Sequence, residues 1–254
     1  MTLERVDFLC NICGRRNLGV PREQAENREY QSCAHCHSSL RMRSLMHLLG
    51  TELFGSPRAL GAFPVDKRIR GIGMSDWEGY AGTLARVFDY RNTFYHQEPR
   101  LDIADIAESE AGKYDFLISS DVFEHIPPSL LDRAFANSRR LLKPGGVFVF
   151  TAPFARGSQT REHFPRLHDF RIVEEGGKHV LLNTTVDGEQ ERFDDLVFHG
   201  GEGMTLEMRM FAEDDLLRRL RAAGFSRAAV RADPATHFGI NWPIDHSLPM
   251  VARA

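Results

Sequence analysis

Four cysteines lie close together near the N-terminus, in two Cys-x-x-Cys pairs. The first pair is Cys10 and Cys13, and the second pair is Cys33 and Cys36. Two such pairs can place four thiolates around one tetrahedral metal ion, and Gly14 suits the turn that follows the first pair. Four protein sulfurs leave no coordination position for water. The spacing therefore predicts a structural zinc site that helps a short segment to fold.

Other interpretations of the cysteine segment stay open. Iron bound as in a rubredoxin uses the same four ligands. His35 and His37 flank Cys36 and could replace one thiolate, although surface histidines on this turn are expected as well. Four separately buried cysteines would bind no metal. A disulfide framework spread over the whole chain is excluded, because all the cysteines lie within the first 36 residues.

A helix is predicted directly after the cysteine segment, over residues 38–55. Ser38 or Ser39 can cap its start, and Gly55 followed by Pro57 ends it. Its apolar residues share one face at helical spacing: Leu45, Leu48, Leu49 and Leu53. We expect this face to dock a small module on a larger domain. The predicted division is residues 1–56, a zinc-ribbon-like module with its docking helix, and residues 57–254.

Strand and helix patterns alternate from residue 67 onward. Strands are predicted at residues 67–75, 92–99, 114–120, 147–153, 226–234 and 247–254. Amphipathic helices are predicted at residues 129–143 and 212–225, and a weaker one passes through Tyr80, Leu84, Val87 and Phe88. This alternation predicts an α/β fold with a doubly wound, mainly parallel sheet that helices cover on both faces.

The alternation stops between residues 155 and 211, before the last predicted helix. This stretch contains a hairpin signal, Val186-Asp187-Gly188-Glu189, and many polar and aromatic residues. Doubly wound folds bind ligands at the carboxyl ends of their strands. We therefore expect a substrate-side insertion that covers this edge of the sheet.

Residues 114–154, YDFLISSDVFEHIPPSLLDRAFANSRRLLKPGGVFVFTAPF, resemble the second half of a class I S-adenosylmethionine-dependent methyltransferase of the type 11-like group. That family has an aspartate-led strand, a turn with Glu-His, an amphipathic helix, LKPGG and a strand that ends in proline. The resemblance covers roughly residues 60–254. It implies a Rossmann-like sheet of seven strands, S-adenosylmethionine as the cofactor and methyl transfer as the reaction. The zinc module is an addition that some bacterial methyltransferases carry.

The first motif of that family is only partly present. The family has a strand that ends in an acidic residue, followed by G-x-G-x-G, whose bare backbone lets the cofactor approach. Here Gly71 replaces the acidic residue, and Ser75 and Trp77 replace later glycines. Because the cofactor carries no phosphate, we expect Gly73 and Ser75, with Met74 between them, to suffice. An ordinary strand-to-helix turn is the alternative.

The resemblance implies further cofactor contacts. An acidic side chain after the second strand usually accepts hydrogen bonds from the ribose hydroxyls, and Glu98 is the candidate, with Gln97 second. A solvent-exposed loop glutamate is the alternative. Asp102 and Ile103 match the residues that meet the adenine, with Asp105 as the alternate. The methionine part of the cofactor lies at the end of the third strand in that family, where this chain has Ser119, Ser120 and Asp121.

Methyl transfer from a sulfonium is an in-line displacement. The enzyme aligns the acceptor and, for an oxygen acceptor, removes its proton, a task that suits histidine near neutral pH. The candidates for this base or for an acceptor anchor are, in order, His163, His199 and His125. A hydrogen bond that only holds loop structure explains each of them equally well. Polar side chains in the same stretch indicate a polar acceptor: Arg156, Gln159, Arg161, Arg166 and Asp169.

Net charge and hydropathy limit the classes of partner that we expect. The net charge of −3 gives no overall basic field, so we do not expect nucleic acid as the main partner. A local basic face stays open, because the cysteine segment contains Arg15, Arg16, Arg22 and Arg28. No apolar run approaches the roughly 20 residues that cross a bilayer. The first residues also lack a signal-peptide pattern, so we expect a cytoplasmic protein.

The favoured function is methylation of an oxygen atom on a polar small molecule or saccharide. One alternative is an RNA methyltransferase whose zinc ribbon holds RNA. Another is a catalytically silent scaffold, which the departures at Gly71, Ser75 and Trp77 motivate. The sequence specifies neither the acceptor nor the oligomeric state.

Overall fold

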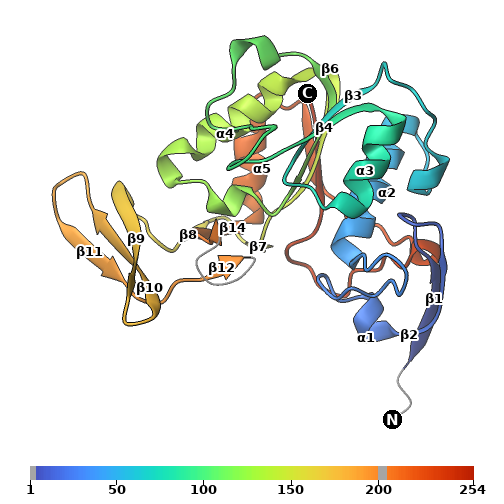
Figure 1. The fold of residues 1–254 in the computed structure, drawn as a ribbon, viewed down its shortest axis with the longest axis horizontal. Coiled ribbons are helices and arrows are strands. Elements are labelled where there is room, and N and C mark those ends of the chain that lie inside the picture. Colours follow the sequence, from blue (N-terminus) through green and yellow to red (C-terminus); the bar gives the residue numbers. More distant parts are fainter. Residues whose placement is uncertain (1–3, 200–204) are drawn as a thin grey trace.

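The computed structural model describes residues 4–199 and 205–254. A central sheet carries helices on both sides, the N-terminal segment lies below one end of the sheet, and a group of strands projects from the opposite side (Figure 1). Among the described residues, every helix is too short or too polar to span a lipid bilayer.

The central sheet has six strands in the order β15-β16-β6-β5-β3-β4. The β4-β3, β3-β5 and β5-β6 pairs are parallel, whereas β16 is antiparallel to both β6 and β15. The strands are β3 (Arg70–Met74), β4 (Asp89–Thr93), β5 (Tyr114–Ser120), β6 (Leu142–Thr151), β15 (Arg227–Val230) and β16 (Met250–Arg253). The predicted α/β fold with a mainly parallel sheet is confirmed.

The prediction of seven strands is wrong for this sheet, which has six in the described residues. β4 is its outer strand on one side, and the chain beyond β4 forms turns. The Asp102 carboxylate accepts a hydrogen bond from the Ala104 N–H at 2.9 Å, and the Asp105 N–H donates to the Asp102 carbonyl oxygen at 2.9 Å. Such local hydrogen bonds compete with strand pairing, so the segment turns instead of extending the sheet.

The strand predicted at residues 92–99 is displaced, because β4 covers Asp89–Thr93. Tyr90 and Thr93 are buried, whereas residues 95–100 are exposed. The Phe94 N–H donates to the Pro99 carbonyl oxygen at 3.0 Å, so the chain loops back directly after the strand. Burial of these side chains against the neighbouring strand therefore favours the earlier position of β4 along the chain.

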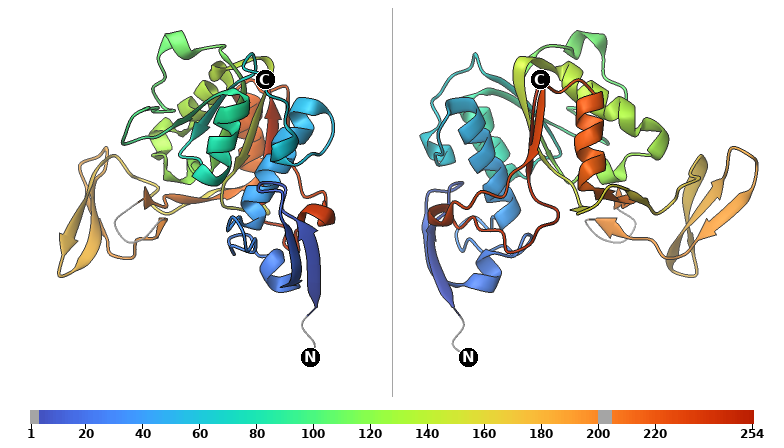
Figure 2. Two further views of the ribbon diagram at one scale, coloured as in Figure 1. Left: turned by 45° about the vertical axis from the view of Figure 1, so that its right-hand side comes forward. Right: turned by 180° about the vertical axis from the view of Figure 1, so that it is seen from behind.

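Alternating side chains of the sheet form one hydrophobic core on each face. Phe116 of β5 packs with α2 and α3, and Leu117 lies in the core that α4 and α5 cover. Figure 2 shows the two helix pairs on opposite sides of the sheet. The helices are α2 (Leu40–Phe54), α3 (Glu78–Val87), α4 (Pro128–Leu141) and α5 (Glu213–Ala222).

Helix α2 lies where the sequence predicts a helix. The Ser39 hydroxyl accepts a hydrogen bond from the Met42 N–H at 3.5 Å, and Gly55 ends the helix with a φ of 72°. Leu45, Leu48 and Leu49 of α2 share a hydrophobic cluster with Val147 and Val149 of β6. The core is therefore continuous from the N-terminal segment to the sheet. The domain division between residues 56 and 57 stays a prediction.

Short elements flank the sheet. The N-terminal segment contains the antiparallel strands β1 (Arg5–Leu9) and β2 (Arg16–Pro21), followed by α1 (Arg22–Ala25). Single-turn 3₁₀ helices are η1 (Leu60–Ala62), η2 (Glu108–Glu110), η3 (Phe123–His125) and η4 (Thr236–Phe238).

The insertion after β6 consists of short strands. They are β7 (Phe154–Ala155), β8 (Arg161–Glu162), β9 (Asp169–Glu175), β10 (Lys178–Thr184), β11 (Gln190–Phe193), β12 (Phe198–His199), β13 (Thr205–Leu206) and β14 (Arg209–Ala212). The predicted hairpin is confirmed, because β10 and β11 pair antiparallel across a turn in which Gly188 has a φ of 82°. Together with β9 they form the sheet that projects in Figures 1 and 2.

Gly71 has a packing role that a substitution can test. A Cβ at this position would overlap with the Phe116 ring, whereas a Cβ on Gly61 of η1 meets nothing within 4 Å. We expect Gly71→Ala to lower the free energy of unfolding by about 1–3 kcal/mol, as overpacked cores do. Urea denaturation measures this change, with Gly61→Ala as the control. Equal stability of the two variants would contradict this packing role.

Candidate functional site

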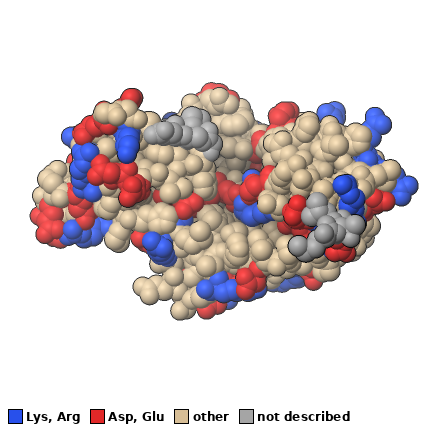
Figure 3. Space-filling model, turned by 90° about the horizontal axis from the view of Figure 1, so that it is seen from below, with Lys and Arg blue, Asp and Glu red and all other residues tan. Residues whose placement is uncertain are grey.

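The carboxyl ends of β3 and β5 face a hollow on the surface. Figure 3 views the molecule from this side and shows the hollow between the part that carries the projecting strands and the part that carries the N-terminal segment. Acidic and basic side chains gather in it. Because doubly wound folds bind ligands at this edge of the sheet, the hollow is the candidate site.

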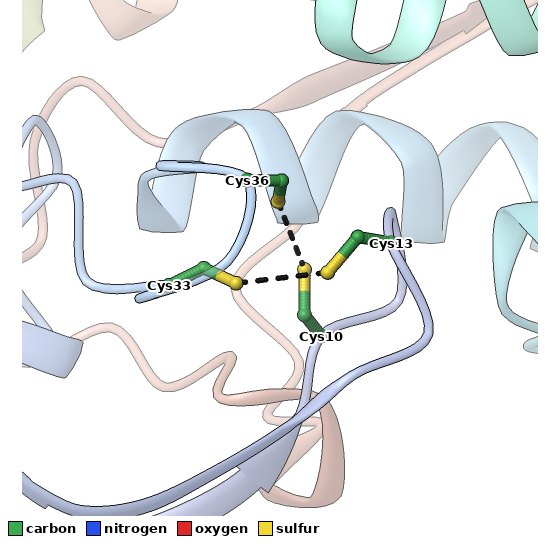
Figure 4. Close-up of side chains that lie close together, drawn as sticks. All are labelled: Cys10, Cys13, Cys33 and Cys36. Carbon is green, nitrogen blue, oxygen red and sulfur yellow. Dashed lines mark hydrogen bonds between the residues drawn. The ribbon is translucent and has the colours of Figure 1, made fainter.

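Four cysteine sulfurs face one another in the N-terminal segment (Figure 4). The Sγ atoms of Cys10 and Cys36 are 3.7 Å apart, as are those of Cys13 and Cys33. All four Sγ atoms lie within 4.8 Å of one another, and none is in a disulfide. Tetrahedral zinc with bonds of about 2.3 Å separates its sulfur ligands by about 3.8 Å. The arrangement therefore fits a zinc ion.

The two cysteine turns share one backbone conformation. Gly14 and His37 each follow the second cysteine of a pair, with φ values of 71° and 60°. Their N–H groups donate to the carbonyl oxygens of Cys10 and Cys33, respectively, both at 2.9 Å. The His35 ring faces a backbone carbonyl at 3.1 Å. The metal-binding cluster found in the described residues of this segment contains the four cysteines and neither histidine.

Two arginines that precede the sheet, Arg28 after α1 and Arg41 of α2, reach the carboxyl end of β5. Arg28 donates hydrogen bonds of 2.9 and 2.7 Å to the Asp121 carboxylate, and Arg41 Nε lies 3.2 Å from the same carboxylate. Arg41 also donates to the Ser120 hydroxyl. Burial raises the pKa of Asp121, but the charges of Arg28 and Arg41 outweigh burial and hold this pKa at about 2. An ionised carboxylate thus joins the N-terminal segment to the site.

The loop after β3 surrounds a buried carboxylate. Asp76 is 4% exposed and accepts hydrogen bonds from the hydroxyls of Tyr80, at 2.8 Å, and Tyr90. A Cβ on Gly73 would overlap with this carboxylate and with the Tyr90 hydroxyl. Internal packing therefore requires glycine at position 73. Ser75 is exposed at the turn, with a left-handed φ of 56°.

The other predicted cofactor residues differ in exposure. Met74 and Ile103 are buried in the core. The Ser119 hydroxyl is buried and has no hydrogen-bond partner among the described residues. Glu98 is exposed, and its carboxylate accepts a hydrogen bond from the Arg100 N–H at 2.9 Å. Contacts of these residues with a cofactor, like those of Ser120 and Asp102, stay predictions.

The three histidines predicted as candidate bases lie together with two glutamates. The ring centroids of His125 and His199 are 4.7 Å apart. Glu124 Oε1 is 3.6 Å from His125 Nε2 and 3.5 Å from His199 Nδ1. Glu207 lies 2.8 Å from His199 Nε2 and 3.8 Å from His163 Nε2. We call these five residues the Glu/His cluster.

Burial and neighbouring charges shift the pKa values of residues in the Glu/His cluster in different directions. Glu124 is fully buried, and burial raises its pKa to about 7, although His199 acts in the opposite direction. The Glu124 carboxylate, together with Glu207, raises the pKa of His199 to about 8. Burial lowers the pKa of His125. Near neutral pH, His199 therefore carries a proton, whereas His125 is neutral and able to accept one.

A buried arginine of β14 positions the Glu/His cluster. Arg209 is fully buried and donates hydrogen bonds to the carbonyl oxygens of Phe123, at 2.9 Å, and Ile126, at 2.6 Å. It also donates to the Glu162 carboxylate at 2.8 Å. These bonds fasten η3, which carries Glu124, to the insertion.

Several residues of the site escape the sequence analysis. Only Glu124 had a local signal, because it stands beside His125 in the Glu-His turn. Arg41 and Arg209 contact partners 79 and 86 residues away, and Asp76 and Glu207 contact partners 14 and 8 residues away, but no motif indicates any of these contacts.

The sequence matches the family described as a methyltransferase domain over residues 62–229. The chain belongs to this family. It is an S-adenosylmethionine-dependent methyltransferase, as the resemblance of residues 114–154 implies. No curated protein sequence matches the methyltransferase.

Several solved structures resemble the fold of the methyltransferase at low sequence identity. The 1,6-didemethyltoxoflavin-N1-methyltransferase of Burkholderia thailandensis is 16% identical, with a TM-score of 0.47 over 84% of this chain and 77% of that chain. The sugar N-methyltransferase KedS8 of a Streptoalloteichus species is 13% identical, with a TM-score of 0.45 over 83% and 85%. The amino pentose methyltransferase CalS10 of Micromonospora echinaspora is 16% identical, with a TM-score of 0.43 over 82% and 91%. Similarity at this level says nothing of the substrate.

The buried Asp76 predicts a pH dependence of stability. Burial raises its pKa to about 7, against the lowering effect of Tyr90 and Tyr80, whereas an unfolded aspartate titrates near about 3.9. Between these values the folded state binds more protons, so the contribution of Asp76 to the free energy of unfolding falls as the pH rises from about 4 to 7.

We therefore expect the stability of the wild type relative to Asp76→Asn to be lower near pH 7.5 than near pH 4.5. Urea denaturation of both proteins at both pH values measures this difference. Asp187→Asn, in the exposed hairpin turn, serves as the control. A difference that does not change with pH would be inconsistent with a protonated Asp76.

Proposed function

We propose that the protein methylates an oxygen atom of a polar small molecule, such as a saccharide, at the carboxyl edge of its sheet. The observation that carries this proposal is the Glu/His cluster, in which Glu124 and His125, which follow β5, meet His163, His199 and Glu207 of the insertion. Such groups can take the proton that a hydroxyl acceptor loses as its oxygen bonds to the methyl carbon. Charged side chains around the hollow suit a polar acceptor.

The cofactor would lie between β3, β4 and β5. Ser75 with Gly73 at the first turn, Glu98 after β4, and Ser120 at the end of β5 are the residues expected to hold it. Bound there, S-adenosylmethionine supplies an electrophilic methyl group on a sulfonium. The carboxylate of Glu98 would orient the ribose through its hydroxyls. The N-terminal segment would close one side of the site through Arg28 and Arg41.

RNA has less support as the acceptor. Of the four arginines that form the expected basic face, Arg22 pairs with Glu4 and Glu26, and Arg28 pairs with Asp121. Arg15 and Arg16 are exposed, which leaves only a small positive surface there. Phosphate binding by nucleic-acid proteins depends on several such charges together.

The cofactor assignment predicts a specific loss of affinity. We expect Glu98→Ala to weaken binding of S-adenosylmethionine about tenfold to a hundredfold, because hydrogen bonds to a charged group contribute about 1.5–3 kcal/mol. Isothermal titration calorimetry measures the affinity. Glu174→Ala, on the exposed β9, should bind as the wild type does. If Glu98→Ala binds equally well, Glu98 does not hold the ribose.

We also propose that the four cysteines hold one structural zinc ion. Cys13→Ser should lose this zinc and lower the melting temperature by roughly 6–12 °C, which corresponds to about 3 kcal/mol in a chain of this size. Metal analysis after gel filtration with a chelator, together with calorimetry, measures both effects. His37→Gly keeps the left-handed turn and should retain the zinc. Iron in place of zinc, or zinc lost in His37→Gly, would refute this site.

A further inference from the structure

Three lone-pair atoms of the Glu/His cluster converge. They are Glu124 Oε1, His125 Nε2 and His199 Nδ1, and all three lie within 4.8 Å of one another. The carboxylate oxygen is 3.6 Å from one imidazole nitrogen and 3.5 Å from the other. These separations are too long for hydrogen bonds of ordinary length. They are close to the roughly 3.0–3.4 Å that separates nitrogen and oxygen ligands bound at about 2.0–2.2 Å to one metal ion.

The outer nitrogen of each imidazole has a hydrogen-bond acceptor. His125 Nδ1 lies 2.7 Å from the carbonyl oxygen of Leu206, and His199 Nε2 lies 2.8 Å from the Glu207 carboxylate. Because a carbonyl oxygen and a carboxylate can only accept, these nitrogens carry the protons. A bound cation requires both rings to be neutral, so it would displace the proton that His199 otherwise carries, and the lone pairs of the inner nitrogens would then face Glu124. Histidines that bind metals are oriented in the same way.

Glu124 lacks any other partner. It is fully buried, and neither of its carboxylate oxygens has a hydrogen bond among the described residues. A buried carboxylate without a partner costs several kcal/mol unless a proton or a cation compensates its charge. Its burial therefore points independently to a bound cation between these three side chains.

We propose that Glu124, His125 and His199 bind a divalent first-row transition-metal cation. Two imidazoles and one carboxylate suit such ions better than calcium or magnesium, which prefer oxygen ligands. Three protein ligands leave positions open for water or for an oxygen atom of a substrate, unlike the four-cysteine site. Glu207 holds the His199 ring in place, and His163, whose Nε2 faces Glu207 at 3.8 Å, stays outside the ligand set.

The role of this cation in methyl transfer rests on the proposed function, but its binding does not. An acceptor hydroxyl on an open position would lose its proton more readily, since a bound cation stabilises the oxygen anion that forms. His163 would then be the histidine of the cluster that remains free to take the proton. The metal site can be tested without cofactor or acceptor, so its failure and the failure of the proposed function are distinguishable.

Cobalt(II) added to the zinc-loaded protein tests the site. We expect one cobalt ion per chain, with d–d absorption but without the thiolate-to-cobalt charge-transfer band that cobalt in the cysteine site would give. Glu124→Gln and His199→Asn should weaken this binding by more than about a hundredfold, because loss of an outer-shell partner alone weakens metal sites about tenfold to a hundredfold. His168→Asn, an exposed histidine of the same insertion, should bind cobalt normally.

The retained zinc of each variant shows that its N-terminal segment is folded, and an unchanged thermal unfolding curve without cobalt shows the same for the rest of the chain. The proposal is overturned if the zinc-loaded wild type takes up no cobalt. It is also overturned if both Glu124→Gln and His199→Asn bind cobalt as tightly as the wild type, or if the bound cobalt shows the thiolate band. If the zinc-loaded wild type takes up no cobalt, a shared proton compensates the charge of Glu124.

Discussion

The buried guanidinium of Arg209 is the interaction on which the candidate site depends. Nη1 of this arginine donates to the carbonyl oxygens of Phe123 and Ile126 and Nε donates to the Glu162 carboxylate, whereas Nη2 has no partner among the described residues. The planar guanidinium gives these bonds fixed directions. They hold η3 against β14, so residues of the sheet edge and residues of the insertion meet in one cluster.

Two carboxylates after β5 have opposite electrostatic environments. One is paired with arginines and the other is not. Asp121 meets Arg28 and Arg41, which keep it ionised and bind the N-terminal segment to the sheet. Glu124 lies deeper and has no arginine or lysine partner among the described residues, so burial raises its pKa. Asp121 is thus held in an ion pair with two arginines, whereas the charge of Glu124 depends on a proton or a cation.

The N-terminal segment is too small to build a core of its own, yet it contributes directly to the site. The four-cysteine cluster orders its turns locally, and the leucines of α2 extend the hydrophobic core of the sheet. The cysteine cluster and the packing of α2 together place Arg28 and Arg41 at the carboxyl edge of β5. The cysteine cluster and the methyltransferase domain are therefore coupled through packing and charge.

Local patterns were sufficient to predict the start and end of α2, the hairpin turn at Gly188 and the grouping of the cysteines, because neighbouring residues decide each of them. The resemblance predicted one strand too many, since local bonds of Asp102 compete with strand pairing. The sequence by itself determined which residue types could do the chemistry: paired cysteines and three histidines. Only the tertiary structure decided that His125 and His199 meet the buried Glu124, because long-range contacts such as those of Arg209 with η3 bring the insertion to the sheet edge.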